Sequence, residues 1–235
     1  MTSALFVVSA ADRWTLNDGT THPTGFWAEE LAEPHRLFRA AGWQITIATP
    51  GGVAPTVDAG SLSERAAGGV ERAGVLTAYL ASIAAELDRP RSLDDIDVRD
   101  YDVVFYPGGH APMEDLAVDE TSGRLLTAAL DAGIVLGVLC HAPAALLAAR
   151  RADGSWPFAG YRLTSFTDAE ERLGGLADKA PWLVQGRLVE LGADFVEGPP
   201  FAPHLEVDRT LYTGQNPASS GMLATAIIDA LAVAA

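Results

Sequence analysis

Residues 133–149 read GIVLGVLCHAPAALLAA, an apolar run that passes directly into a helical pattern. Short apolar runs of this kind are typical of strands buried in a parallel sheet. Cys140 falls at the predicted junction, His141 follows it, and Pro143 suits the first helical turn. The stretch therefore predicts an α/β fold with a cysteine at a strand-to-helix elbow. That elbow would lie at the C-terminal edge of the sheet, where open α/β folds bind ligands.

The rest of the chain continues this alternation. Apolar runs at residues 5–8, 45–48 and 103–106 predict further strands, and residues 27–41 and 121–132 have the length of crossover helices. Gly42 and Gly133 follow those helices at the position of a left-handed C-cap. Strands and helices that alternate in this way predict an α/β sandwich.

Residues 51–99 interrupt the alternation of short strands and helices. They combine a Gly/Ala/Ser-rich loop, a helical stretch at residues 75–87 and an acidic connector. We interpret this segment as an insertion packed on the sheet of a single domain, residues 1–235. The remaining expected elements are strands near Leu163, Phe195 and Leu211 and helices around residues 182–191 and 218–233.

Composition limits the partners of the chain. Its 235 residues include 16 Lys+Arg against 31 Asp+Glu, a formal net charge of −15, which disfavours nucleic acid and anionic membrane surfaces. No apolar run reaches the roughly 18 residues of a membrane helix. Residues 1–9 do not resemble a signal peptide, so the expected location is the cytoplasm. Cys140 is the single cysteine, which excludes an internal disulfide and leaves a thiol that a reducing compartment keeps free.

Cys140 has two interpretations. Free cysteines are among the most buried residue types, so it could be a core residue. Its position beside His141, at the predicted start of a helix, instead favours a nucleophile. Helical N-terminal amides favour negative charge, which predicts a partly ionised thiol.

Two other stretches carry candidate site residues. In the sequence YPGGH at residues 106–110, Gly108 and Gly109 would allow backbone amides to turn toward a ligand, although such a pair also marks ordinary turns. In GFWAEELAEP at residues 25–34, Pro34 should loosen the helix at Glu30. Most helical glutamates are solvated, and Glu29 would point about 100° away from Glu30.

Five motifs in order resemble the ThiJ/PfpI superfamily, and most closely its branch of glutathione-independent glyoxalases (glyoxalase III) and thirty-one-kilodalton heat-shock chaperones. The motifs are TGFWAEE from Thr24 with Pro34, TPGG from Thr49 with Asp58 and Ser61, PGGH ending at His110, GVLCHAP around Cys140, and TGQNPASS from Thr213. The resemblance implies a flavodoxin-like three-layer α/β/α sandwich with a mostly parallel sheet, related to class I glutamine amidotransferases. It also implies a homodimer.

The resemblance assigns roles to individual residues. Cys140 matches the nucleophile, His141 its adjacent histidine, and Glu30 the acid that contacts the thiol. The third member of the triad falls in FTDAEE at residues 166–171, where we place it at Glu171, with Asp168 and Glu170 as alternatives. The residues expected at the oxyanion and substrate are Gly108, Gly109, His110 and Trp27.

Some features depart from that pattern or lie outside it. The branch commonly has glycine where this chain has Ala111 and Ala142, and an added methyl there could narrow the pocket or disturb the backbone. His22, His35 and His204 lack metal-ligand spacing, and we interpret them as surface or satisfied core histidines. We expect no metal and no cofactor, since no nucleotide-binding fingerprint is present.

The expected function is a glutathione-independent glyoxalase that acts on a small reactive carbonyl such as methylglyoxal and releases a 2-hydroxy acid through a cysteine hemithioacetal. The same thiol could serve protein deglycation. The alternatives are a stress-inducible holding chaperone and a cysteine redox sensor. A chaperone would expose the apolar residues of the insertion, namely Val75, Leu76, Tyr79, Leu80, Ile83 and Leu87. Peptidase or amidotransferase activity is disfavoured, because the chain has no room for an ammonia-supplying partner domain.

Overall fold

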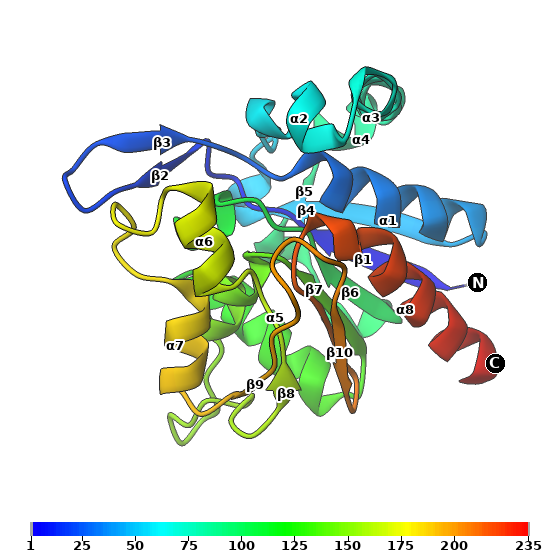
Figure 1. Ribbon diagram of the computed structural model, residues 1–235. Coiled ribbons are helices and arrows are strands. Elements are labelled where there is room, and N and C mark those ends of the chain that lie inside the picture. Colours follow the sequence, from blue (N-terminus) through cyan, green and yellow to red (C-terminus); the bar gives the residue numbers. More distant parts are fainter. Residues whose placement is uncertain (1, 235) are drawn as a thin grey trace.

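A seven-stranded sheet forms the centre of the computed structural model, which describes residues 2–234 (Figure 1). Its order is β10-β11-β7-β6-β1-β4-β5, and every pairing except β10 with β11 is parallel. The strands are β1 (Ser3–Val7), β4 (Gln44–Thr49), β5 (Arg91–Ser92), β6 (Val103–Tyr106), β7 (Val135–Leu139), β10 (Leu205–Asp208) and β11 (Leu211–Gly214). This arrangement confirms the flavodoxin-like α/β sandwich.

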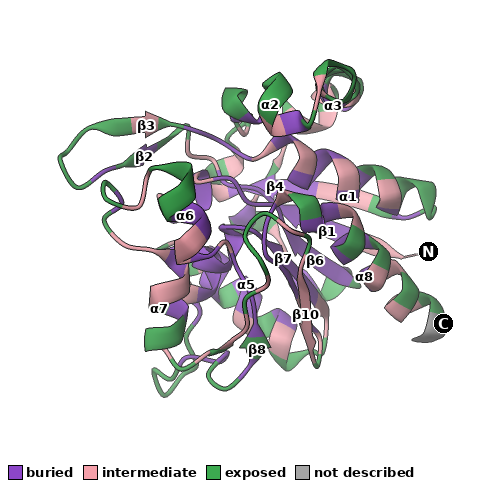
Figure 2. Cartoon of the chain, viewed as in Figure 1, coloured by how far each residue is buried: buried purple, intermediate pink, exposed green. Residues whose placement is uncertain are grey.

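Helices cover both faces of the sheet. α1 (Ala28–Ala40) and α8 (Ser220–Ala234) pack side by side on one face, and α5 (Glu120–Asp131) covers the other (Figure 1). Alternate residues of β1 enter the two cores, so that Phe6 packs with the α1 side and Leu5 with the α5 side. Burial on both faces explains the continuous apolar strands, which Figure 2 shows as buried. Within the described residues, no helix is long and apolar enough to cross a membrane.

The strands and crossover helices lie within one or two residues of their predicted ranges. Gly42 and Gly133 have φ values of 80° and 72°, as the left-handed cap positions require. In the C-terminal part, α7 (Val184–Glu190) and the small parallel pair β8 (Arg162–Leu163) and β9 (Asp194–Phe195) occupy the expected places.

Three elements were not expected from the sequence. They are the hairpin of β2 (Arg13–Thr15) and β3 (Thr21–Pro23), the helix α6 (Asp168–Gly174), and the antiparallel edge strand β10. The hairpin strands have three residues each, too few for a periodic pattern to show. The segment after β7 also differs, because residues 142–148 form a 3₁₀ helix, η6 (Ala142–Ala148), instead of an α-helix. Gly123 of α5 packs against its end, where a Cβ would lie 2.3 Å from the Ala148 carbonyl oxygen.

Residues 51–99 are not only helix and loop, since β5 adds an edge strand to the sheet. The other elements are α2 (Glu64–Ala67), α3 (Val70–Ser82), α4 (Ala84–Leu87) and the 3₁₀ turns η1 (Pro50–Gly52), η2 (Ala59–Leu62), η3 (Leu93–Asp95) and η4 (Val98–Asp100). The predicted helix at residues 75–87 begins earlier, at Val70, and breaks at Ile83.

The apolar side of α3 packs against α1. Leu76, Leu80 and Ile83 are buried, Tyr79 and Leu87 are partly buried, and Val75 is exposed. The six residues therefore do not form the exposed apolar surface that client binding through this segment requires.

Candidate active site

Cys140 lies immediately after β7, in a backbone conformation that few residues adopt. Its φ is 61°, and Phe201 and Arg209 are the other non-glycine residues with positive φ in the part of the chain that the structure describes. Two hydrogen bonds hold the elbow: the Cys140 amide donates to the Gly214 carbonyl at 2.8 Å, and the Phe166 amide donates to the Cys140 carbonyl at 2.8 Å. Strain of this kind is common where a side chain is presented to a ligand.

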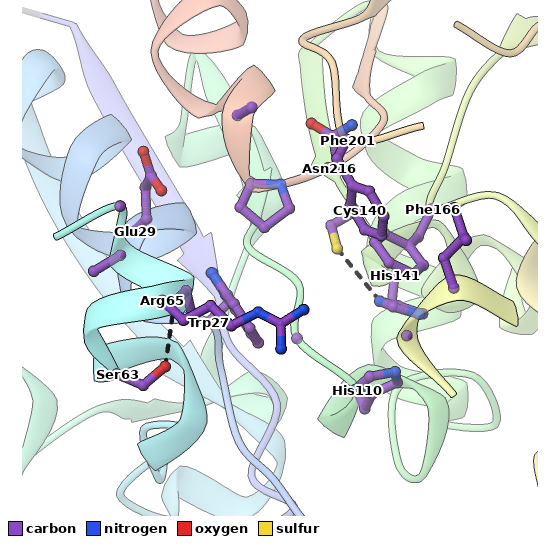
Figure 3. Close-up of a pocket in the computed structure, with 18 of the residues that line it drawn as sticks. Trp27, Glu29, Ser63, Arg65, His110, Cys140, His141, Phe166, Phe201 and Asn216 are labelled. Atoms are coloured by element: carbon purple, nitrogen blue, oxygen red, sulfur yellow. Dashed lines mark hydrogen bonds between the residues drawn. The ribbon is translucent and has the colours of Figure 1, made fainter. Parts of the chain in front are cut away.

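The Cys140 side chain is buried, yet it lines a cavity of about 880 Å³ (Figure 3). The walls come from the start of α1, the helix α2, the loop after β6, the elbow, and the segments around residues 166–176 and 201–218. Both interpretations of Cys140 thus describe it in part, since it belongs to a core cluster and also faces a cavity.

His141 connects the thiol to a carboxylate. Its Nδ1 lies 3.3 Å from Cys140 Sγ, and its Nε2 lies 2.7 Å from Glu171 Oε2 (Figure 3 shows the first contact). A carboxylate accepts, so Nε2 carries the proton and Nδ1 is left to accept one from sulfur. Burial, with the nearby His110, lowers the pKa of His141 and favours this neutral form.

Of the three acids in residues 166–171, Glu171 is the one at hydrogen-bond distance from His141. Glu170 instead closes a capping box with Thr167 and accepts from the Phe201 amide and Asn216 Nδ2, each at 2.8 Å. Burial opposes ionisation of Glu171, but hydrogen bonds from His110 and His141 outweigh it and lower the Glu171 pKa.

Glu30 is fully buried on α1. Its Oε2 accepts a hydrogen bond from the Gly108 amide at 2.8 Å, and its Oε1 has no hydrogen-bond partner among the described residues. Burial raises the pKa of Glu30 to about 8, against the opposing effects of Cys140 and the Gly108 amide. The carboxyl is therefore protonated at neutral pH and has an O–H to donate. Glu29 points elsewhere and pairs with Arg72.

The environment of Cys140 corrects the expectation of a partly ionised thiol. Burial raises the Cys140 pKa well above its usual range, followed by the Glu30 carboxyl, which ionises at lower pH than the thiol and then repels a thiolate, and the Gly109 backbone only partly offsets this. The 3₁₀ helix after the elbow is also not the α-helix whose N-terminal amides were expected to favour a thiolate. The thiol proton must consequently be removed by a base, and His141 Nδ1 is the base in contact.

The two positions after β6 require glycine because neighbouring backbone and side-chain atoms lie too close for a Cβ atom. A Cβ at Gly108 would lie 2.6 Å from the Leu139 carbonyl and 2.7 Å from Glu30 Oε2, and one at Gly109 would lie 2.3 Å from the Gly25 carbonyl. Gly109 also has a φ of 92°. The loop therefore packs closely against the elbow and the start of α1, and Gly109 lines the cavity beside Cys140.

The alanines that replace glycine do not disturb the backbone. Ala111 and Ala142 are buried, and neither has a positive φ, so no glycine-only conformation is lost. We expect Ala111→Gly to leave the rate of carbonyl turnover within about twofold of wild type, because Ala111 already adopts a backbone conformation open to any residue. Steady-state kinetics of the purified variant would check this, and a rise of tenfold or more would show that the Ala111 methyl restricts the site.

The raised pKa of Glu30 makes a prediction about stability. In the folded state the Glu30 carboxyl keeps its proton up to about pH 8, whereas in the unfolded chain it loses the proton near pH 4.5. Glu30 therefore makes folding less favourable as the pH rises between those values. A shift of this size corresponds to roughly 5 kcal/mol at most, at about 1.4 kcal/mol per pH unit. Glu30→Gln should therefore gain stability over wild type from pH 5 to pH 8, measured by denaturant unfolding. A difference that does not change with pH would contradict the buried, protonated carboxyl.

The remaining expected residues also line the cavity. His110 Nε2 donates to Glu171 Oε1 at 3.2 Å, and its ring lies against the His141 ring with centroids 4.2 Å apart and planes tilted by 43°. The Trp27 side chain lies in the wall, and its Nε1 has no hydrogen-bond partner among the described residues. Sequence reasoning missed Arg65, Phe166, Phe201 and Asn216 as lining residues. The Arg65 side chain extends from α2 into the cavity (Figure 3). Phe166 and Asn216 lie in the FTDAEE and TGQNPASS stretches, which gave them no role, and no local pattern marks Arg65 or Phe201.

Fold and site together define a class: α/β proteins with a mostly parallel sheet that present a cysteine at the elbow after a central strand. The chain belongs to the DJ-1/PfpI family, whose family model matches residues 22–230. It is 29% identical over 231 residues to the protein/nucleic acid deglycase HchA of Staphylococcus aureus (strain bovine RF122 / ET3-1), an alignment that covers 93% of this chain and 76% of that protein.

Solved structures share the fold along almost the whole chain. The 24-kDa rapid encystment protein of Francisella tularensis has 25% identity and a TM-score of 0.87, with 98% of this chain and 99% of that one covered. Glyoxalase III of Candida albicans has 24% identity and a TM-score of 0.81, with 97% of each chain covered. The second likeness concerns the fold alone.

Proposed function

We propose that this protein is a cysteine-dependent, glutathione-independent glyoxalase that converts 2-oxoaldehydes such as methylglyoxal into 2-hydroxy acids. The observation that carries the proposal is the contact series Cys140–His141–Glu171 at a cavity that Gly109 also lines. The S. aureus relative is a deglycase, which is consistent with carbonyl chemistry at such a site.

The first step is addition of the thiol to the aldehyde. His141 Nδ1 takes the proton from Cys140 Sγ while the sulfur electron pair forms a bond to the aldehyde carbon. The C=O π pair moves to oxygen, where the Gly109 amide and the Glu30 O–H are suited to donate hydrogen bonds. Protonation of that oxygen gives a hemithioacetal. Glu171 stabilises the imidazolium formed at His141.

The second step moves hydrogen between the two carbons. His141, neutral again, removes the proton from the carbon bonded to sulfur. The electron pair forms a C=C bond to the neighbouring carbonyl carbon, and the oxygen of that carbonyl takes up a proton, which gives an enediol. Protonation at that neighbouring carbon, with loss of the proton from the hydroxyl on the sulfur-bearing carbon, leaves a thioester on Cys140. Water then adds to the thioester carbon, the C–S bond breaks, and sulfur regains its proton. The aldehyde carbon is oxidised and the ketone carbon reduced, so only water is consumed.

Deglycation is a second candidate because of the size of the cavity. Its volume of about 880 Å³ falls in the range of pockets for drug-sized ligands, roughly 300–1,000 Å³. It therefore has room for an early glycation adduct on a side chain. The formal net charge of −15 disfavours a nucleic-acid substrate, although the name of the S. aureus relative includes one.

The test is an assay of the purified protein with methylglyoxal in the absence of glutathione. Lactate formation, followed by NMR, should exceed that of buffer and of a heat-denatured sample. A parallel assay with N-acetylcysteine or N-acetyllysine pretreated with methylglyoxal tests deglycation. If lactate formed in neither assay, the proposal would be overturned. The homodimer that the resemblance implies and the redox-sensor alternative stay predictions.

A further inference from the structure

Three potential metal ligands gather beside the cavity, outside the cysteine site. His22 lies on β3, Asp58 precedes η2, and His110 follows the Gly-Gly pair after β6. One ligand atom from each side chain lies within 4.8 Å of the corresponding atoms of the other two. The three residues are far apart in the sequence, so their spacing gave no sign of a shared site. From the sequence, His22 is expected to be a surface or satisfied core histidine, whereas the structure places it half-buried beside Asp58 and His110.

The His110 ring is held with one nitrogen available. Its Nε2 lies 3.2 Å from Glu171 Oε1, and the ring stacks on Trp14 with centroids 5.2 Å apart and planes 13° apart. The structure gives its Nδ1 no hydrogen-bond partner in residues 2–234. Metal-binding histidines almost always donate their second ring N–H to a carboxylate or carbonyl, which fixes the tautomer. Glu171 supplies that acceptor to His110.

The Asp58 carboxylate is also oriented by its neighbours. Thr24 Oγ1 donates to Oδ2 at 2.8 Å, and the Gly60 amide donates to Oδ1 at 2.8 Å. Each oxygen keeps a lone pair for another contact. The residue is only 7% exposed, so its place is fixed by packing as well as by these bonds.

His22, on the β2–β3 hairpin, is the third residue of the cluster. Its ring meets the His110 ring edge-on, with centroids 5.6 Å apart and an interplanar angle of 86°. It is half-buried, and neither of its ring nitrogens has a hydrogen bond to another group in the described part of the chain. Two imidazoles and one carboxylate are thus brought together with no covalent or hydrogen-bond pairing among themselves.

We propose that His22, Asp58 and His110 bind one divalent transition-metal ion of the Zn²⁺ type. Two imidazole nitrogens and a carboxylate oxygen are a donor set that suits Zn²⁺, with a fourth position open to solvent or a ligand. The net charge of −15 favours accumulation of cations near the protein. The site goes beyond the proposed glyoxalase function, which requires no metal.

A second cluster, formed by His110, His141 and Glu171, is less suited to a metal ion. There the His141 Nε2 and Glu171 Oε2 atoms are already paired at 2.7 Å, so an ion would have to break that hydrogen bond. The two clusters share His110, whose Nε2 contacts Glu171 and whose Nδ1 has no hydrogen-bond partner among the described residues. An ion bound there would hold the His110 ring next to the Glu171 carboxylate.

The test uses the full chain carrying Cys140→Ala, so that the thiol cannot bind the metal. After treatment with a chelator and buffer exchange, the protein is titrated with Zn²⁺ alone by isothermal titration calorimetry. We expect one ion per chain. His22→Ala and Asp58→Asn should each weaken binding by more than about 100-fold, since even the loss of an outer-shell partner costs 10–100-fold. His204→Ala is the matched control, because this histidine also lies beside an acid, Glu206 at 3.1 Å, and should leave binding unchanged.

Two further measurements decide the assignment. Co²⁺ bound in place of Zn²⁺ should give visible absorption bands of a low-coordinate site, and these bands should disappear in His22→Ala, which changes only a half-buried residue of a hairpin. The proposal is overturned if the chain shows no saturable Zn²⁺ binding. It is also overturned if His141→Ala abolishes binding while His22→Ala does not, because the ion would then belong to the catalytic pair.

Discussion

Cys140→Ser is expected to reduce lactate formation from methylglyoxal on the order of 10⁴-fold or more, the size of loss seen when a nucleophile is removed from other hydrolytic sites. The hydroxyl has a far higher pKa than a thiol and is a weak nucleophile without strong activation. His141 Nδ1, which contacts the sulfur at 3.3 Å, is placed for the smaller task of deprotonating a thiol. The measurement is the steady-state rate without glutathione, with circular dichroism and a thermal melt to confirm folding.

No second cysteine can compensate, because Cys140 is the single one in the chain. A serine is smaller than cysteine and should fit the same backbone, so the variant should melt within a few degrees of wild type. If the folded variant kept more than a few per cent of wild-type activity, the covalent mechanism would be wrong.

Glu171→Gln is expected to lower the rate by about 10³-fold or more. The carboxylate of Glu171 accepts from His141 Nε2 at 2.7 Å and so leaves Nδ1 free to take the thiol proton. A carboxamide can donate its N–H to Nε2, which places the ring proton on Nδ1 and removes the base. The corresponding change in a serine protease triad reduces kcat by about 10⁴-fold. The rate should be measured across pH, because the loss should persist wherever the wild type is active.

Asp168→Asn is the matched control for this variant. Asp168 lies on the same helix and in the same acidic run, but its carboxylate is near Arg172 at 3.8 Å and does not contact His141. It should keep activity within about threefold of wild type. Equal losses in the two variants would indicate that the charge of α6, and not the Glu171 contact with His141, is what the reaction needs.

The sequence predicted the sheet well because its strands are buried on both faces. A strand such as β6 contains only apolar and aromatic residues, so its limits are visible in the sequence itself. The hairpin β2–β3 and the edge strand β10 have no such signal, since they are short and only partly buried. The 3₁₀ form of η6, whose end packs closely against Gly123, was not visible in the sequence.

The candidate site could be located from the sequence, but its electrostatics could not. Motif order placed Cys140, His141, Glu30 and Glu171 together, and the structure puts all four near one another at the sheet edge. The high pKa of the thiol depends on how deeply it is buried and on which carboxyl lies beside it. Those are properties of packing, as is the meeting of His22 with Asp58 and His110.

Covalent attachment of substrate to Cys140 is the central claim, and acid-quenched intact-protein mass spectrometry during methylglyoxal turnover tests it most directly. The expected result is a species heavier by one substrate molecule, mapped by peptide analysis to Cys140 and absent from Cys140→Ser. Adducts confined to lysine and arginine side chains, present equally in wild type and Cys140→Ser while lactate is produced, would contradict it.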